Sequence, residues 1–245
     1  KYDEKYFLNT SAALIGALGS IVAAWHRIRN GDEPISSKPD SSYAENFLHI
    51  LGAEKITPLM TRIMDATLVL HGEHTINAST FTAMVTSSTL ANASQVVASA
   101  IGSLSGPLHG GANEKVIAML QKIESKEEIR PWLDDTLKAK NVVWGMGHRE
   151  YSVKDPRANI LTDMVQELFE EREGGVTDIF EKAIELEKAC EEKLSHKGVY
   201  PNVDFYSGIL YKEMDIPTDI FTPIFAMSRV SGWLAHWIEQ IQDNK

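Results

Sequence analysis

Four short segments of the sequence combine ionisable side chains with glycine, proline or small residues, as catalytic loops often do. They are L-H-G-E-H-T-I-N-A-S-T (70–80), G-P-L-H-G-G-A-N-E (106–114), G-M-G-H-R-E-Y-S-V-K-D-P-R-A (145–158) and P-N-V-D-F-Y-S-G (201–208). Glycines beside a histidine let another group approach the backbone closely. Histidines and carboxylates move protons and stabilise charge at neutral pH. The segments therefore indicate acid–base chemistry, although His109 by itself also fits a helix end in solvent.

Metal binding and covalent catalysis are the first alternatives. His71 and His74 are spaced i, i+3, which brings two rings to one side of a helix. The metalloprotease pattern H-E-x-x-H does not occur, so the other interpretation is one core histidine and one that faces solvent. A hydrolase elbow G-x-S-x-G would need serine at Leu104, and acidic neighbours raise the pKa of a thiol such as Cys190. We expect neither a metal site nor a covalent nucleophile.

Phosphate-binding loops and nucleic-acid binding also lack support. The pattern G-x-x-x-x-G-K-[ST] is absent, and G-M-G-H lacks the third glycine of a dinucleotide-binding fingerprint. The chain has 24 Lys and Arg against 34 Asp and Glu, for a net charge of -10, and no basic run. An anionic ligand would therefore need a local basic pocket rather than a positive field over the whole surface.

Asp204 is the remaining candidate for proton transfer. It has apolar residues on both sides and no adjacent cation in the sequence. Such surroundings can raise the pKa of a carboxyl group and suit it to act as a base. Aspartate is equally typical of the N-cap of a helix, so this segment alone leaves both roles open.

Helical periodicity dominates the elements that must position these residues. Apolar side chains recur at helical spacing over 56–64, 178–194 and 230–241, with polar or charged residues between them. Alternating period-two runs are scarce, so we predict a mainly α-helical protein. Turn-forming residues break the pattern at 31–42 and 197–201.

The stretch from Thr75 to Asn113 contains no Asp, Glu, Lys or Arg. Its length alone would allow a membrane-spanning helix, but it holds too many Ser, Thr and Asn residues for lipid. Its small residues let helices approach one another closely. We expect helices buried within the protein, some of them at a subunit interface, and no membrane association.

Length and composition are those of an ordinary globular protein. The chain has 245 residues, 43% of them hydrophobic and 24% charged, enough for one large domain or two modest ones. A single cysteine allows no intrachain disulfide, which suits a cytoplasmic protein, and no signal peptide opens the chain. Since the first residue is Lys, we expect a piece of a longer protein.

Taken together and in this order, the four segments resemble the citrate synthase family. A fifth segment, F-A-M-S-R-V-S-G-W-L-A-H-W (225–237), resembles a late helix of that family. The resemblance runs from His74 to Arg229, most of the chain, and P-N-V-D-F-Y-S-G is similar to bacterial members. Many members read H-A-D-H-E where this sequence reads H-G-E-H-T.

The resemblance implies the roles of three catalytic residues. Asp204 would remove a proton from the methyl group of acetyl-CoA, and His109 would hydrogen-bond the thioester oxygen as the enol or enolate forms. His148 would polarise the ketone of oxaloacetate. Gly110 and Gly111 would leave room for the thioester beside His109.

The resemblance also implies the groups that hold the substrate. His74, Arg157 and Arg229 would bind its carboxylates, because the planar guanidinium suits bidentate pairing. Arg149 is a weaker candidate. No metal and no permanently bound cofactor are implied; acetyl-CoA would be a co-substrate.

The family fold is all-α, with the active site in a cleft between two domains. By resemblance, a large domain would comprise 1–110 and 212–245, with a smaller domain, 111–211, inserted. Members are longer and usually offer an arginine from the C-terminal tail to the neighbouring subunit, so we expect truncation at both ends.

The implied activity is that of an acyltransferase that converts the acyl group to alkyl on transfer: acetyl-CoA condenses with oxaloacetate, and water releases citrate and CoA, as in the tricarboxylic acid cycle. A 2-methylcitrate synthase, which uses propionyl-CoA, is the nearest alternative, since one methyl group is worth only about 1–3 kcal/mol of discrimination. A non-catalytic helical scaffold is the distant one. We expect a cytoplasmic homodimer or higher homo-oligomer.

Overall fold

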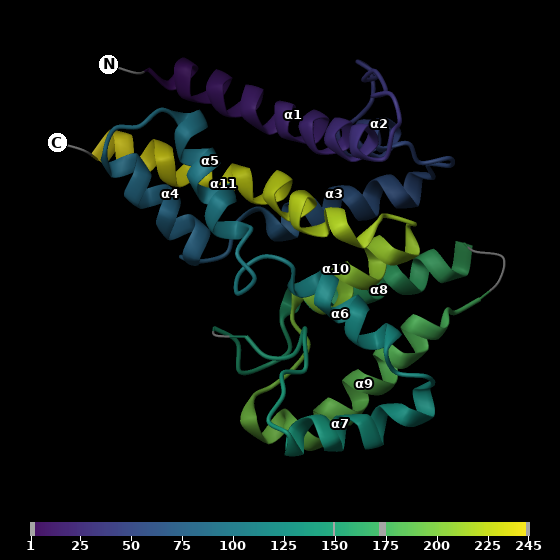
Figure 1. The fold of residues 1–245 in the computed structure, drawn as a ribbon. Helices are drawn as coiled ribbons and strands as arrows, with labels where there is room; N and C mark the ends of the chain where they lie inside the picture. The colour runs from purple at the N-terminus through teal and green to yellow at the C-terminus, as the bar shows by residue number, and fades with distance from the viewer. Residues whose placement is uncertain (1–2, 149, 172–174, 244–245) are drawn as a thin grey trace. The chain divides into compact units, whose positions relative to one another are not determined.

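The computed structural model describes residues 3–148, 150–171 and 175–243, and within these ranges the chain forms helices and no strand. The chain divides into two compact units, unit 1 (1–110 and 222–245) and unit 2 (111–221) (Figure 1). The predicted all-α fold class is confirmed. The boundary between the units falls after Phe221 rather than after Tyr211. The identity of the units as the large and small domains stays a prediction.

Unit 1 consists of long helices. They are α1 (Glu4–Arg29), α2 (Tyr43–Leu51), α3 (Pro58–Gly72), α4 (Ala78–Ser88), α5 (Ala93–Leu104) and α11 (Phe221–Asp243), whose first residue still belongs to unit 2. The charge-free stretch forms α4 and α5, which pack against each other. The polar run 31–42 is the connection between α1 and α2, as predicted.

Side-chain caps decide where the helices of unit 1 begin. An Asx, Ser or Thr side chain accepts the first-turn N–H at each start, which replaces a missing intrahelical bond. The capping residues of α1 to α5 are Asp3, Ser42, Thr57, Asn77 and Asn92.

The core of unit 1 is built around α11. Trp233 and Trp237 are fully buried, and the ring of Phe7 on α1 meets Trp237 edge-on at 5.3 Å. The indole N–H of Trp237 donates to the carbonyl of Ala91 between α4 and α5 (3.2 Å), and the hydroxyl of Ser228 donates to the carbonyl of Leu68 on α3. α11 is thereby tied to α3 and to the connection between α4 and α5.

Unit 2 contains the remaining helices. These are α6 (Ala112–Gln121), η1 (Lys126–Glu128), α7 (Ile129–Lys138), α8 (Pro156–Glu171), α9 (Asp178–Leu194), η2 (Ser195–Lys197), α10 (Val203–Glu213) and η3 (Thr218–Ile220). The helix predicted over 178–194 coincides with α9. The buried helix α10 packs against both α6 and α8.

A partly buried ion pair joins α9 and α10 to the segment that precedes α8. The Lys154 ammonium lies 2.5 Å from the Glu187 carboxylate, and the hydroxyl of buried Tyr206 donates to the same carboxylate. Burial, followed by the charge of Glu187, raises the pKa of Tyr206. The same two causes raise the pKa of Cys190 to about 12, so this thiol is inert.

The helix α1 leaves much of its apolar surface uncovered. Leu8, Ile21 and Ile28 are each at least 58% exposed. The helix α1 is long and apolar enough to cross a membrane. The core helix of a soluble protein meets the same criteria of length and composition, but only 22% of the apolar window of α1 is buried. Among the described residues it is the one helix that meets these criteria.

Two helix-interior glycines give a matched test of the packing. A Cβ at Gly208 would lie 2.7 Å from the Asn113 carbonyl oxygen, whereas one at Gly102 would meet nothing within 4 Å. We predict that Gly102→Ala stabilises the fold by about 0.5–1 kcal/mol through helix propensity. Gly208→Ala should destabilise it by about 1–3 kcal/mol, since α10 must move away from α6. Urea unfolding of both variants measures this, and shifts of the same sign would refute the close packing of α10 on α6.

Candidate active site

The predicted site residues divide equally between the units. His74, His109 and Arg229 lie in unit 1, and His148, Arg157 and Asp204 lie in unit 2. Within each unit, the structure brings an arginine into electrostatic contact with a histidine: Arg229 with His109 and Arg157 with His148.

His109 lies in a tight turn after α5. Its backbone N–H donates to the carbonyl of Gly106 (3.0 Å), and the N–H of Gly110 donates to the carbonyl of Leu104 (2.9 Å). A Cβ at Gly110 would lie 2.3 Å from that same carbonyl oxygen. On the side where a Cβ would stand, the backbone of Leu104 fills the space, so glycine is needed here for packing. That Gly110 leaves room for the thioester stays a prediction.

The next residue, Gly111, has a φ of 85°, a left-handed conformation that favours glycine. It is the N-cap of α6 and offers no side chain to cap it. The helix that follows His109, α6, thus begins at Ala112.

One nitrogen of the His109 ring is hydrogen-bonded to Ser79, within unit 1. Nε2 accepts the backbone N–H of Ser79 (3.2 Å) and lies 2.8 Å from the Ser79 hydroxyl oxygen. A backbone N–H can only donate, so the neutral ring carries its proton on Nδ1. Burial, and then the charge of Arg229, lowers the pKa of His109. The ring is thus a neutral hydrogen-bond donor through Nδ1 at neutral pH.

Ser79 is a site residue that the sequence did not reveal. It is fully buried in the first turn of α4. Its hydroxyl donates to Asn77 (2.9 Å) and accepts the indole N–H of Trp233 (3.2 Å). Since its backbone N–H has no partner within the helix, the position of Ser79 orients the imidazole of His109.

Arg229 is almost completely buried on α11. Its Nε donates to the carbonyl of His71 (2.7 Å), and its guanidinium carbon lies 4.7 Å from the centre of the Phe225 ring. A positive charge is thereby fixed at the end of α3, next to His109.

The helix α3 ends at Gly72, so His71 and His74 do not share a helical face. The alternative of two rings on one helical side, considered from the i, i+3 spacing, therefore does not apply. His71 is the core histidine, with Nδ1 2.8 Å from the carbonyl of Thr67, and His74 is half-buried in the connection to α4. No group of three metal-ligating side chains occurs in the part of the chain that the structure describes.

In unit 2, His148 has the opposite tautomer. Its Nδ1 accepts the backbone N–H of Glu150 (3.0 Å), so the neutral ring carries its proton on Nε2. Burial and then the charge of Arg157 lower its pKa, while Asp155 and Glu150 raise it to a lesser degree. His148 is therefore also a neutral donor at neutral pH, through Nε2.

Main-chain bonds tie the His148 segment to the residues that precede α10. The N–H of Gly147 donates to the carbonyl of Tyr200 (2.7 Å), and the N–H of Asn202 donates to the carbonyl of Gly145 (2.9 Å). The Asn202 side chain also donates to the carbonyl of Gly147 (2.9 Å). Both glycines have φ near 80°, which is why G-M-G can make this turn.

Asp204 lies in the first turn of α10 and is half-buried. Asn202 is the N-cap, and its side chain accepts the Asp204 N–H (3.0 Å). The sequence left open whether Asp204 caps the helix. In the structure Asn202 takes that role. The N-terminal end of the helix dipole favours a carboxylate at this place.

Arg157 is the second residue of α8, and its guanidinium and backbone N–H both bind Asp155. The Asp155 carboxylate accepts the Arg157 backbone N–H (2.9 Å), Nε (3.1 Å) and Nη2 (2.8 Å). Burial raises the pKa of Asp155, but the bonds and charge of Arg157, together with the Val203 N–H, lower it overall. Asp155 was missed although D-P-R is a typical helix start. Arg149 lies outside the described residues.

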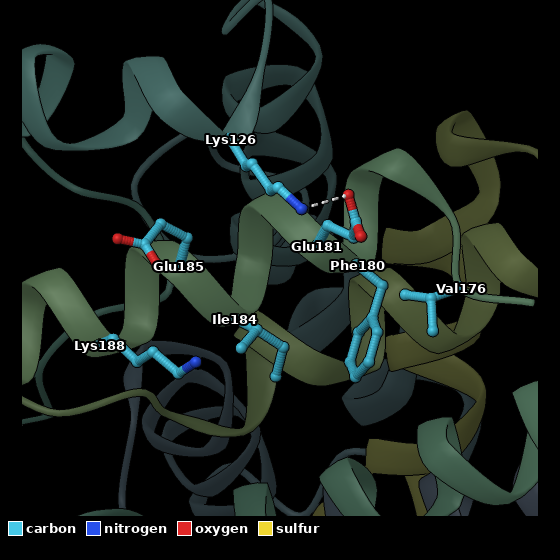
Figure 2. A pocket seen from close by; sticks show the side chains of 7 residues that line it. All are labelled: Lys126, Val176, Phe180, Glu181, Ile184, Glu185 and Lys188. Carbon is cyan, nitrogen blue, oxygen red and sulfur yellow. Dashed lines mark ion pairs between the residues drawn. The ribbon is translucent and has the colours of Figure 1, made fainter.

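A cavity of about 300 Å³ on unit 2 holds none of the predicted site residues (Figure 2). It is lined by Lys126, Val176, Phe180, Glu181, Ile184, Glu185 and Lys188. Lys126 and Glu181 form a half-exposed ion pair of 3.2 Å at this cavity. Because both partners are half-exposed, the pair contributes little to stability. None of the predicted catalytic residues lines this cavity.

Comparison with known proteins decides the family. The sequence model described as "Citrate synthase, C-terminal domain" matches residues 1–245. This chain belongs to the citrate synthase family. The citrate synthase of Synechocystis sp. is 50% identical over 99% of this chain, and the chain covers 61% of that protein. The chain thus spans about three fifths of the curated relative's length.

Solved citrate synthases have the same fold. The enzyme of Pyrobaculum aerophilum is 35% identical, with a TM-score of 0.94 over 100% of this chain and 61% of its own. That of Thermoplasma acidophilum, solved as a ternary complex with carboxymethyl coenzyme A and oxaloacetate, is 34% identical, with a TM-score of 0.91 over 99% of this chain and 64% of its own.

The environment of His109 predicts its titration. We expect a pKa below 6.5, because burial and Arg229 both oppose a second positive charge. Arg229→Gln should raise this pKa by removing the cation, and Arg229→Lys, which keeps the charge, should leave it lowered. NMR titration of the ring Cε1–H measures each value. A wild-type pKa above 6.5 would contradict the assigned environment.

Proposed function

We propose that the protein containing this chain condenses acetyl-CoA with oxaloacetate and hydrolyses the product to citrate and CoA, as an acyltransferase of the tricarboxylic acid cycle. The observation that carries the proposal is the pair of neutral histidines whose tautomers are fixed by backbone N–H groups. Family membership and the ternary complex of the Thermoplasma acidophilum relative support it.

The first chemical step is removal of a proton beside the thioester. The Asp204 carboxylate takes the proton from the acetyl methyl group, and negative charge develops on the thioester oxygen. His109 donates from Nδ1 to that oxygen. A neutral donor suits an enol or enolate because it stabilises the oxygen without becoming a strong acid itself.

The second step forms the carbon–carbon bond. The enol or enolate carbon attacks the ketone carbon of oxaloacetate while His148, donating from Nε2, polarises the ketone oxygen. That oxygen becomes a hydroxyl by taking up one proton, and Asp204 gives up the one that it accepted, so that the protons balance. Water then cleaves the thioester of citryl-CoA to release citrate and the CoA thiol. The reaction requires both histidines and Asp204 to act on the same pair of substrates.

Arg157, Arg229 and His74 hold the carboxylates of oxaloacetate in this proposal. The two arginines are already fixed by Asp155 and by the carbonyl of His71. Preorganised cations lose little entropy on binding and suit planar carboxylates. Acetyl-CoA is a co-substrate, and no permanently bound cofactor or metal is required.

Release of CoA thiol by the full-length protein tests the proposed reaction. With oxaloacetate, we expect thiol release from acetyl-CoA and little from propionyl-CoA. Asp204→Asn should lower kcat by roughly 10²–10⁴-fold, because the amide cannot accept the proton. Asp163→Asn, which removes an exposed carboxylate on α8, serves as the control and should leave kcat unchanged.

A preference for propionyl-CoA would assign the protein to 2-methylcitrate synthesis with the same catalytic groups. Lack of thiol release from either thioester by a folded protein would overturn the reaction and leave the non-catalytic helical scaffold. Full activity of Asp204→Asn would remove this residue from the mechanism.

We also propose that the protein is a homodimer or a higher homo-oligomer in the cytoplasm. The charge-free helix α4 supports this, since Phe81 and Val85 are 61% and 51% exposed on one face, followed by exposed Leu90. An apolar patch of this kind is typical of an interface between copies. The single cysteine, buried and without a disulfide, is consistent with a reducing compartment.

A charge on this face tests the assembly. Phe81→Glu should weaken self-association at least about tenfold, because an unpaired carboxylate would be buried at the interface. Ile160→Glu, on α8 in unit 2 and 45% exposed, is the control and should leave the oligomer unchanged. Light scattering after size exclusion measures both. An oligomer that tolerates Phe81→Glu would exclude this face of α4.

A further inference from the structure

Near the site of unit 2, the carboxylate of Asp155 accepts several hydrogen bonds at once. Its side chain is 1% exposed. Besides the three N–H groups of Arg157, it accepts the backbone N–H of Val203 (3.2 Å), the first residue of α10. A buried carboxylate is stable only with such a set of donors. One side chain therefore joins the start of α8 to the start of α10.

The bonds to Arg157 define the plane of its guanidinium. Nε and Nη2 both donate to Asp155, the planar two-point geometry that a carboxylate accepts from arginine. The bond to the Arg157 backbone N–H fixes the main chain of the same residue. Rotation of the side chain would break two of these bonds, so the direction of the remaining N–H groups is set before any substrate binds.

The bond from the Val203 N–H to Asp155 positions a different part of the site, the first turn of α10. Val203 immediately precedes Asp204, and its N–H is one of the first-turn donors that a helix cannot satisfy itself. Asn202 accepts the next N–H along, that of Asp204. Without Asp155 the first N–H of α10 would be buried without its acceptor, and the turn that carries Asp204 would lose its connection to 155–157.

We propose that Asp155 is a positioning residue that sets two groups of the proposed reaction at once: the guanidinium of Arg157 and the first turn of α10 with Asp204. This inference rests on the proposed function. It assigns Asp155 a role in both oxaloacetate binding and proton removal, although Asp155 itself touches no substrate.

Two variants separate the two connections. Asp155→Asn in the full-length protein should raise the KM for oxaloacetate and lower kcat, each by at least about tenfold, because both groups are released. Val203→Pro removes the N–H donor at the first helical position, where proline is tolerated, and replaces one buried apolar side chain by another while the bonds between Asp155 and Arg157 stay. It should lower kcat and leave the KM for oxaloacetate within about twofold of wild type. Asp163→Asn is the control with unchanged constants.

Two further readouts do not depend on activity. In Asp155→Asn the Val203 amide should exchange its hydrogen faster. The pKa of His148 should rise, because Arg157, once released, no longer lowers it, and Arg157 outweighs Asp155 there while Glu150 is unchanged. A fall would show that Arg157 stays in place without Asp155. A loss of stability alone would move neither the KM nor this titration. If the asparagine variant does not fold, Val203→Pro still tests the connection to Asp204.

A folded Asp155→Asn protein with wild-type KM and kcat would overturn the inference, as would a Val203→Pro variant with wild-type kcat. If the wild-type protein releases no thiol, the proposed function fails by itself. The positioning role is then judged by oxaloacetate binding, Val203 exchange and His148 titration. Unchanged values of all three in Asp155→Asn would overturn it too.

Discussion

The first N–H groups of an α-helix have no partner within the helix, and in this protein several of them bind the side chains of the candidate site. At α4, the Ser79 N–H donates to His109. At α8 and α10, the N–H groups of Arg157 and Val203 donate to Asp155. The residues that start the helices therefore also fix the ring and the carboxylate that the chemistry needs. A shift of a helix start by one residue would misplace the side chain that its N–H binds.

Electrostatics reinforces the same arrangement in each unit. Burial, and then a guanidinium near each histidine, lowers the pKa of both rings, so both remain neutral donors. The arginines stay in place because their own bonds are to groups inside the same unit, the carbonyl of His71 for Arg229 and Asp155 for Arg157. A chain with a net charge of -10 thereby presents positive charge where an anionic substrate is proposed to bind.

The sequence predicted the helical class and the residues that bear ionisable groups, because periodicity and residue type are local properties. It identified α9 to the residue, since a capping threonine and regular apolar spacing coincide there. Ser79 and Asp155 were missed because their roles depend on partners far along the chain, His109 and Val203. The surroundings of Gly110 and His74 depended on where α3 and α5 end, and helix ends are set in part by tertiary contacts such as the bond from Arg229 on α11 to the carbonyl of His71.

The use of a main-chain donor at His148 has a consequence for how this site can drift during evolution. At position 150, which is exposed, an N–H is present whatever side chain stands there, so the protonation pattern of His148 survives every replacement except proline. Sequence alignments would therefore underrate this position, since variation there would look neutral. The same property offers protein engineers a place beside a catalytic ring where the side chain can be exchanged without inverting which ring nitrogen is the donor.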